Sequence, residues 1–443
     1  MAISEPKILS IKFLDTPMGR LAWREASPAF AMELTPEFLA LGHDLSPLHL
    51  PLEGFRAGPR VFNPTDSPFP QGLPGLIADS LPDAWGERML RSEVPGLQTV
   101  LGKLAAIGMR GPGALSFEPV LGAGADVLGV EVSLGKLAKE AQQLQVGPAP
   151  LTSDQVLQVL ARGGSSLGGA FPKTSAHLPL EGEKLERKKI LVGGPTPAGH
   201  VPCILKFSPA DDEGGGSVEF AFWKLAQAAG LRVPRACLVH DGKRRHFACG
   251  RFDRYLGKDG RTHRRHVHTL SGMLHKRASD AVIDYEEFMR LTRRLCGMVE
   301  AEECLRRAIF NLLSTNRDDH GRNHAFLYDE ESRVWTLTPA YDLTPNVANV
   351  LIGLSWMGSQ QVPQRFEAVE RLAEVGGISA RKARAIFCEV EAVVLGQWRP
   401  IAKKAGVPTD IASLWEENMK SQTLALRADV SKGSARPTKR RSK

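Results

Sequence analysis

A short polar segment, residues 314–329, gathers side chains that can hold a metal ion and move a proton. It reads STNRDDHGRNHAFLYD and contains Asp318, Asp319, His320 and Asn323. The apolar run before it, LRRAIFNLLS, has helical spacing, so the polar residues are expected in the loop at the end of a helix. Because Asx side chains also favour turns, a purely structural loop stabilised by Asp319 and His320 is an open alternative.

A predicted β-hairpin places a third oxygen ligand next to this loop. The segments HAFLY and RVWTLT flank the turn residues DEES, and the hairpin returns the chain to its starting end with strands about 4.8 Å apart. Asp342, in PAYDL, is therefore expected beside Asn323. Both would be ligands for a hard cation such as Mg²⁺, with Asp318 as a base or hydroxyl-orienting group. A zinc pair formed by His320 and His324 is a weaker alternative, because HAFLY reads as a strand.

A glycine-rich segment, GSSLGGAFPKTSAHL at residues 164–178, follows a predicted helix, LTSDQVLQVLARGG. Three glycines would let backbone amides approach a phosphate: Gly164, Gly168 and Gly169. Four side chains add donors: Ser165, Ser166, Lys173 and Thr174. The segment is not a Walker A loop, since Pro172 stands where that motif needs glycine. A flexible surface loop is the alternative interpretation of this segment alone.

Lys206 lies within the alternating segment HVPCILKFSPADD, which is typical of a half-buried strand. A lysine there is either an edge-strand charge or a ligand aimed at a polyanion held by the glycine-rich loop, as in kinases. The next segment, GGGSVEFAFWKLAQAAGL, has helical spacing, and strands are expected again in ACLVH and RRHFACGRFDR. Strand and helix therefore alternate over residues 100–260.

Composition sets the class of protein. The 443 residues, 42% of them hydrophobic, exceed what one core usually supports, so two domains or lobes are expected. No apolar run approaches the roughly 20 residues of a membrane span, and no leader pattern begins the sequence, which favours a cytoplasmic protein without membrane contact. The six cysteines form no CxxC pair, so buried thiols are favoured over a zinc site or disulfides.

The net charge of +8 is largely a property of the C-terminus. Residues 432–443, KGSARPTKRRSK, carry six Lys or Arg residues and no acid, which leaves +2 for the rest of the chain. This tail has too few apolar residues to fold and is expected to be disordered. It either contacts nucleic acid through its charge or is simply solvated.

The order of six motifs resembles the HipA family of bacterial toxin serine/threonine kinases. These motifs are RGPGAL, SSLGGAFPK, ILKFSP, RFDR, NRDDHGRN and PAYDL, and GLIADSLPDAWG is similar to the N-terminal domain of that family. The resemblance spans roughly residues 5–425. It implies that Asp318 is the catalytic aspartate, that Asn323 and Asp342 hold magnesium, and that Lys206 contacts the phosphates of ATP.

The resemblance also assigns residues around the nucleotide. It implies that Phe252 lines the adenine pocket and that the loop around Gly168 and Gly169 cradles the phosphates. Ser166, with Ser165 beside it, matches the serine that the family autophosphorylates to switch itself off.

Three positions depart from the family pattern. Gly250 replaces a glutamate that touches adenine, Phe171 stands where glutamine is frequent, and Val218 with Glu219 replaces an Asn-Glu pair. Glu219 is therefore a candidate partner for Lys206.

The sequence thus predicts an α+β protein, with a mixed α/β N-terminal part and an all-α C-terminal lobe. The expected segments are a HipA N-terminal-like domain (1–122), a kinase N-lobe (123–260), a helical C-lobe (261–430) and a basic tail (431–443). The expected activity is transfer of the γ-phosphoryl group of Mg-ATP to a protein serine or threonine.

The resemblance implies growth arrest through an aminoacyl-tRNA synthetase. It also implies a helix-turn-helix antitoxin, through which the protein meets operator DNA. A small-molecule or lipid kinase would use the same residues. A kinase-dead DNA-binding or scaffold protein is the third interpretation, motivated by the tail, by RTHRRHVH at 261–268 and by Gly250.

Overall fold

The protein is described by a computed structural model that covers residues 4–122, 129–146, 172–208, 215–277, 283–346, 348 and 350–433. The chain divides into two compact units, neither of which is continuous in sequence. The first unit comprises Met1–Phe220, Pro234–Arg277 and His324–Thr338, and the second comprises Ala221–Val233, Ala278–Asn323 and Pro339–Lys443. The domain boundaries expected at residues 122, 260 and 430 stay a prediction.

The first unit begins with an antiparallel five-stranded sheet in the order β4-β3-β2-β1-β5. The strands are β1 (Ile8–Phe13), β2 (Thr16–Arg24), β3 (Ala29–Leu34), β4 (Arg60–Phe62) and β5 (Leu115–Glu118). Leu14 takes a positive φ of 55°, so the chain reverses at Leu14 and Asp15, and Thr16 opens β2. The segment RGPGAL leads into β5.

Short helices accompany this sheet. They are α1 (Pro36–Leu41), two 3₁₀ helices (Leu52–Phe55 and Pro70–Gly72), α2 (Gly75–Ala78), α3 (Ala84–Glu93) and α4 (Val100–Ile107). Thr35, Asp83 and Thr99 cap α1, α3 and α4, because each side chain accepts a hydrogen bond from a backbone amide of the first turn.

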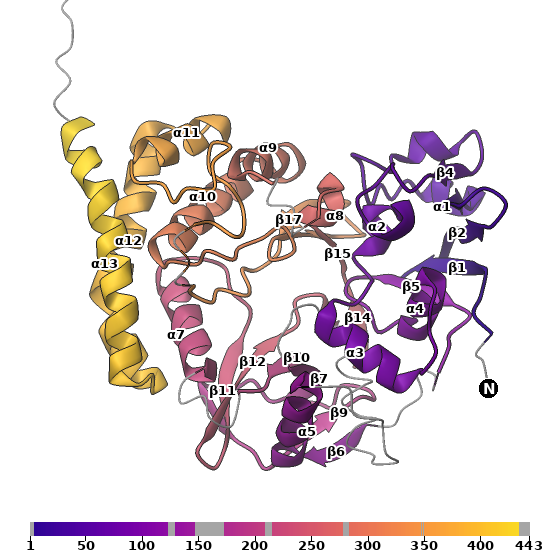
Figure 1. The fold of residues 1–443 in the computed structure, drawn as a ribbon, viewed down its shortest axis with the longest axis horizontal. Coiled ribbons are helices and arrows are strands. Elements are labelled where there is room, and N and C mark those ends of the chain that lie inside the picture. Colours follow the sequence, from indigo (N-terminus) through magenta and orange to yellow (C-terminus); the bar gives the residue numbers. More distant parts are fainter. Residues whose placement is uncertain are drawn as a thin grey trace, which may run out of the picture. The chain divides into compact units, whose positions relative to one another are not determined.

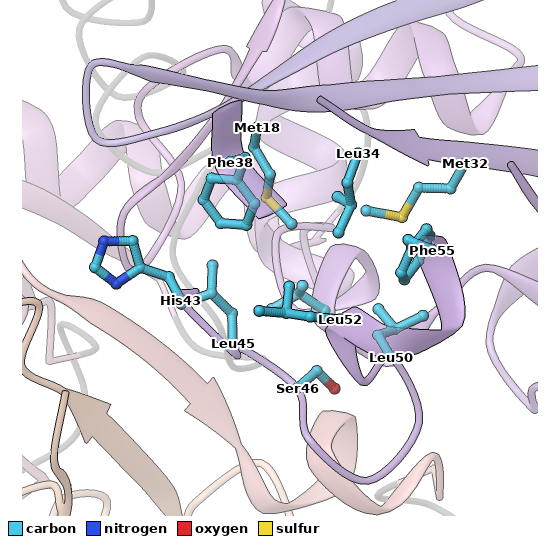
Figure 2. Close-up of a pocket in the computed structure, with 11 residues that line it drawn as sticks. Met18, Met32, Leu34, Phe38, His43, Leu45, Ser46, Leu50, Leu52 and Phe55 are labelled. Atoms are coloured by element: carbon cyan, nitrogen blue, oxygen red, sulfur yellow. The ribbon is translucent and has the colours of Figure 1, made fainter. Parts of the chain in front are cut away.

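A small cavity lies in the core between this sheet and its helices (Figure 2). Its walls are mainly Leu, Met and Phe side chains, and the space inside is about 10 Å³, roughly that of one water molecule. The hydroxyl of Ser46, at its margin, lies 3.2 Å from Nε2 of His268, whose Nδ1 lies 2.6 Å from Asp79. Because Ser46 is 1% exposed and His268 is fully buried, this chain of hydrogen bonds belongs to the core.

The second sheet of this unit has seven strands in the order β6-β9-β7-β10-β12-β11-β8. They are β6 (Val130–Ser133), β7 (Lys173–Leu178), β8 (Lys184–Glu186), β9 (Lys189–Val192), β10 (Val201–Lys206), β11 (Ala236–Asp241) and β12 (Arg244–Gly250). The strands expected in HVPCILKF, ACLVH and RRHFACG are confirmed. β10 is an interior strand, so Lys206 is not an edge-strand charge. Helix α5 (Leu134–Val146) follows β6, and α7 (Gly215–Ala228) begins in this unit and continues into the second.

The remaining strands of the first unit are a pair and a three-stranded sheet. β13 (Arg254–Leu256) pairs with β14 (Thr262–Arg264), and β15 (His266–Thr269) pairs with the hairpin of β16 (Ala325–Tyr328) and β17 (Trp335–Leu337). The predicted hairpin is confirmed. The short helix α8 (Leu270–Leu274) follows β15.

The segment RTHRRHVH is not the free basic surface on which the DNA-binding interpretation relied. It forms β14 and β15, and His266 and His268 are buried at 3% and 0% exposure. Arg264 donates hydrogen bonds to the carbonyls of Gly113 (3.1 Å) and Leu115. The charge in this segment is therefore partly committed to the interior of the first unit.

The second unit is built from helices, and its described residues contain no strand. Besides the end of α7 they are α9 (Tyr285–Cys296), α10 (Met298–Leu313), α11 (Glu367–Val375), α12 (Ala380–Ala405) and α13 (Thr409–Gly433). α10 packs against the other four, and α12 and α13 run beside each other (Figure 1). Asp284 and Glu287 form a capping box at α9, and its Gly297 end has a φ of 88°.

The α+β fold expected from the sequence is confirmed, with its helical part in the second unit. The loop interpretation of residues 164–178 is wrong for Lys173–Leu178, which form β7. The disorder expected from residue 431 is wrong for residues 431–433, which end α13. The helix predicted at 151–164, the remainder of that loop up to residue 171 and the tail beyond Gly433 lie outside the described residues. Of the six thiols, three are buried and two are half-buried, but the expectation of buried thiols is wrong for Cys388, which is exposed. None of the described helices is long and apolar enough to span a membrane.

Candidate active site

The segment after α10 presents one carboxylate to solvent and buries the next. The helix ends at Leu313, and Thr315 takes a φ of 59°, which turns the chain out of the helix. Asp318 is then exposed, whereas Asp319 is 2% exposed. The second residue of the DD pair is therefore a group of the interior, and Asp318 is the one that is open to solvent.

A relay of amide side chains fixes the backbone at Asp318. The backbone N–H of Asn316 donates to the backbone carbonyl of Asn311 in α10 (2.9 Å). The side chain of Asn316 donates from Nδ2 to Oδ1 of Asn311 (3.3 Å). Oδ1 of Asn316 in turn accepts from the Asp318 N–H (3.3 Å). Both asparagines are buried, so their hydrogen bonds are shielded from water. Sequence reasoning missed them, because nothing in the helical pattern marks Asn311 as polar support for a loop five residues later.

Asn323 closes the loop. Its side-chain Nδ2 donates to the Asp318 carbonyl (3.0 Å), and its backbone N–H donates to the His320 carbonyl (2.8 Å). With Nδ2 engaged, Oδ1 is the atom of Asn323 that suits a cation. The amide orientation follows from this hydrogen bond.

Asp342 lies close to the same loop. The hydroxyl of its neighbour Tyr341 donates to the Arg322 carbonyl (2.7 Å), and Asp342 itself has a φ of 55°. Partial burial of its carboxyl group raises the pKa of Asp318; His320 opposes this rise, and the negative charge of Asp342 adds to it. The charges of these two carboxylates therefore interact, whereas the expected position of Asp342 beside Asn323 stays a prediction.

The donor set suits magnesium. Two neighbouring carboxylates repel each other, and the charge of Asp342 accordingly raises the pKa of Asp318. A divalent cation between them would relieve that repulsion. Among the described residues no group of three or more His, Cys, Asp and Glu side chains surrounds a common point. Mg²⁺ does not require such a cage, since it is commonly held by one or two protein oxygens together with phosphate and water.

In the first unit, Lys206 forms an ion pair with Glu219. Lys206 ends β10 and Glu219 lies in the first turns of α7, and their side chains are 20% and 14% exposed. The partner suggested by the sequence is therefore the observed one. The ion pair therefore fixes the position of the Lys206 ammonium group.

Lys173 stands next to Lys206 in the sheet. The two are register partners on β7 and β10, so their side chains leave the same face. Lys173 is 4% exposed, and its carbonyl accepts a hydrogen bond from Trp85 Nε1 (3.0 Å). This face of the sheet therefore carries two cationic side chains, of which Lys206 is paired with Glu219.

The RFDR motif has a structural role that the sequence did not reveal. Asp253 accepts hydrogen bonds from Arg251 (2.7 and 2.9 Å), from Arg254 (2.8 Å) and from the Gly113 N–H (2.9 Å). Arg254 also donates to the carbonyls of Gly111 (2.7 Å) and Gly113 (3.0 Å). The motifs RGPGAL and RFDR therefore bind each other. Phe252, between these charges, is half-buried directly after β12.

The remaining sequence-predicted residues, Ser165, Ser166, Gly168 and Gly169, lie outside the described part of the chain. The structure thus brings together Asp318, Asn323 and Asp342 in the second unit, and Lys206 with Glu219 in the first. The roles assigned to all of these residues stay predictions.

Two family models match the sequence over most of its length. Residues 165–398 match the HipA-like C-terminal domain, and residues 9–118 match the HipA N-terminal domain. The chain belongs to the HipA family. The N-terminal match covers the five-stranded sheet, and the C-terminal match includes Lys206, Asp318, Asn323 and Asp342.

Two relatives show how far the similarity extends. This HipA-family chain is 29% identical over 244 residues to the putative kinase Y4mE of Sinorhizobium fredii. The aligned residues cover 51% of this chain and 56% of that protein. The chain therefore spans little more than half the length of that curated relative. It shares its fold with HipA of Shewanella oneidensis MR-1, solved with HipB and operator DNA, at a TM-score of 0.69 and 17% identity over 97% of this chain and 100% of that one.

Proposed function

We propose that the protein is an ATP-dependent kinase that transfers the γ-phosphoryl group to a serine or threonine hydroxyl of a protein. The observation that carries this proposal is the pair of neighbouring carboxylates, Asp318 and Asp342, at a loop closed by Asn323. An exposed carboxylate beside a metal-binding oxygen pair is the arrangement that phosphoryl transfer requires.

Asp318 is the group that meets the acceptor hydroxyl. Because burial and the charge of Asp342 raise its pKa, this carboxylate is a better hydrogen-bond acceptor than an isolated surface aspartate. It orients the hydroxyl and accepts its proton as the bond from the hydroxyl oxygen to the γ-phosphorus forms and the bond from that phosphorus to the bridging oxygen breaks, which releases ADP. The amide relay from Asn311 holds the backbone of Asp318 while this happens.

Asn323 Oδ1 and the Asp342 carboxylate are the proposed magnesium ligands. Mg²⁺, when bound, would neutralise charge on the phosphate oxygens. Lys206 contacts the phosphates, and Glu219 keeps its ammonium group in place. Lys173, on the same face of the sheet, adds a second positive charge. Phe252 is proposed to line the adenine pocket, with the loop of Ser165, Ser166, Gly168 and Gly169 over the phosphates.

We further propose a toxin–antitoxin setting in the cytoplasm. The family supports it, and so does the shared fold with a HipA solved together with HipB and operator DNA. The proposed partners are a helix-turn-helix antitoxin, operator DNA reached through that antitoxin, and an aminoacyl-tRNA synthetase as substrate. Autophosphorylation at Ser166 or Ser165 and growth arrest belong to the same proposal.

Incubation of the purified protein with ATP labelled at the γ-phosphate, with Mg²⁺ and cell lysate, tests this function. We expect label on serine or threonine of a discrete protein, identified by mass spectrometry, and loss of that label when EDTA removes the metal. Label on a small metabolite alone would favour the small-molecule kinase instead. Failure to bind Mg-ATP in calorimetry would contradict the kinase assignment altogether.

A further inference from the structure

We propose that Asp319 is a positioning residue for the phosphoryl-transfer site: with Tyr285 and Asn311 it holds the segment that carries Asp318, and this hold depends on the negative charge of its carboxylate. The proposal rests on the proposed function for its catalytic consequence. The structural part, a charge-dependent anchor under the loop, stands without that function.

The anchor consists of three buried polar side chains. Oδ2 of Asp319 accepts hydrogen bonds from the hydroxyl of Tyr285 in α9 and from Nδ2 of Asn311 in α10 (3.1 Å). Asn311 Nδ2 also reaches the Tyr285 oxygen (3.1 Å). All three residues are at most 2% exposed. One carboxylate oxygen therefore ties the loop to two different helices.

The same asparagine connects the anchor to the catalytic carboxylate. Oδ1 of Asn311 accepts from Asn316, and Oδ1 of Asn316 accepts from the backbone N–H of Asp318. A displacement of Asn311 therefore moves the hydrogen-bond partner of Asp318. Asp319 thus acts on the site through Asn311 and Asn316, without touching the reacting atoms.

The glycine-containing segment after Asp342 closes the anchor from the other side. The N–H groups of Ile352 and Gly353 donate to the Arg317 carbonyl (2.8 and 2.9 Å). A Cβ at Gly353 would lie 2.5 Å from the backbone N and from Oδ1 of Asp319. A glycine is required here because the backbone packs directly against the carboxylate.

The charge of Asp319 is linked to pH in the neutral range. Burial raises the pKa of Asp319 to about 7, against the hydrogen bonds from Tyr285 and Asn311 and the charge of Arg317, which lower it. Tyr285 and Asn311 are the polar side chains that face the carboxylate from α9 and α10. Cys304 of α10 contributes to the raised pKa of Tyr285. The segment of Gly353 presents backbone, and the loop itself carries Arg317.

Protonation weakens the anchor. A carboxylate is a stronger hydrogen-bond acceptor than a neutral carboxyl group. The hydrogen bonds from Tyr285 and Asn311 therefore weaken when Asp319 takes up a proton. The folded state binds this proton more tightly than the unfolded chain does. Asp319 therefore favours folding below pH of about 4, and this contribution is lost as the pH rises toward about 7. Ionisation of Asp319 thus lowers the stability of the fold. We attribute the presence of this buried carboxylate to its positioning role.

Two measurements over pH 5.5–8.5 test the proposal. The first is tryptophan fluorescence of the protein without nucleotide, because the Trp356 ring is buried with its centroid 4.8 Å from that of Tyr285. We expect a one-proton transition near pH 7 that disappears in Asp319→Asn and in Trp356→Phe. In Tyr285→Phe it should shift to higher pH, because a hydrogen bond that favours the carboxylate is gone.

The second measurement is kcat and KM for ATP in the phosphoryl-transfer assay. Wild-type kcat should fall as the pH drops through about 7 and level off near the kcat of Asp319→Asn, which should itself show no transition near pH 7, with KM for ATP unchanged. Gly353→Ala should lower kcat similarly while keeping the fluorescence transition. Tyr328→Phe, a buried tyrosine whose hydroxyl lies 3.2 Å from His43 in the first unit, is the matched control and should behave as wild type.

The outcomes separate this inference from the proposed function. If the fluorescence transition persists in folded Asp319→Asn, another group titrates and the charge-dependent anchor is refuted, whatever the activity. If the transition disappears but kcat at pH 8 equals that of the wild type, the anchor exists and its positioning role is refuted. If the transition behaves as expected and no variant has kinase activity under any condition, the proposed function fails instead.

Discussion

Asp253 offers a test of why the RFDR motif is present. The substitution Asp253→Asn removes the charge that two arginines share, while it preserves the shape of the side chain. Asp253 is 5% exposed, and the side chains of Arg251 and Arg254 are each 9% exposed. Burial alone would raise the pKa of this carboxyl, but the charges of Arg251 and Arg254 lower it well below the ordinary value.

The magnitude follows from the burial of the cluster. Removing one partner of a buried ion pair costs about 3–5 kcal/mol, because the remaining charges stay desolvated and uncompensated. The melting temperature of the first unit should therefore fall by on the order of 10 °C, measured by differential scanning calorimetry. Because the pKa of Asp253 is lower in the folded protein than in the unfolded chain, its ionised carboxylate stabilises the fold above a pH of about 4, and this stabilisation is lost as the pH falls. The difference in melting temperature between the wild type and Asp253→Asn should therefore become smaller below that pH.

A matched control lies a few residues further along the chain. Asp259→Asn removes an exposed aspartate that pairs with His263 (2.9 Å), and it should leave the melting temperature unchanged. If Asp253→Asn melts at the wild-type temperature at pH 7, the clamp between RGPGAL and RFDR does not stabilise the unit. The structural account of the motif would then be refuted.

Three further predictions concern the nucleotide site and the tail. Lys206→Met should weaken ATP binding in calorimetry by about tenfold or more, and Glu219→Gln should weaken it less; equal binding by Lys206→Met would exclude this lysine from the phosphate site. Wild-type protein incubated with Mg-ATP should carry phosphate on residues 164–174. Because that phosphate adds about −1.5 to −2 charge, the unphosphorylatable Ser165→Ala, Ser166→Ala double variant should bind ATP more tightly than the phosphorylated protein, and equal affinity would contradict self-limitation. Deletion of residues 432–443 should leave kinase activity unchanged but reduce the dependence of non-specific DNA binding on salt. The slope of the logarithm of the binding constant against the logarithm of the salt concentration should become less steep, by at most about 0.9 for each of the six charges removed.

Local pattern was sufficient for much of the fold. The alternation in HVPCILKF predicts β10, the helical spacing before Ser314 predicts α10, and the turn residues DEES predict the hairpin, because each of these signals lies within one element. The hairpin itself is confirmed, whereas the position of Asp342 beside Asn323 that it implied stays a prediction.

Long-range support for the site was not predictable in the same way. Tyr285 lies 34 residues before Asp319, and no spacing rule connects a tyrosine of one helix with a loop carboxylate after the next. The two aspartates are adjacent in sequence, yet one is exposed and the other buried, because the turn at Thr315 decides which side faces the helices. Likewise, the basic letters of RTHRRHVH gave no sign that Arg264 donates to buried carbonyls.

The central claim is that Asp318, and not its neighbour, performs phosphoryl transfer with Asp342 as metal ligand. The most direct test is the intact mass of purified wild type, Asp318→Asn, Asp319→Asn and Asp342→Asn after incubation with Mg-ATP, each shown to be folded by circular dichroism. We expect phosphate on the wild type, none on Asp318→Asn or Asp342→Asn, and a reduced but detectable amount on Asp319→Asn. Wild-type phosphorylation of Asp318→Asn would contradict the account.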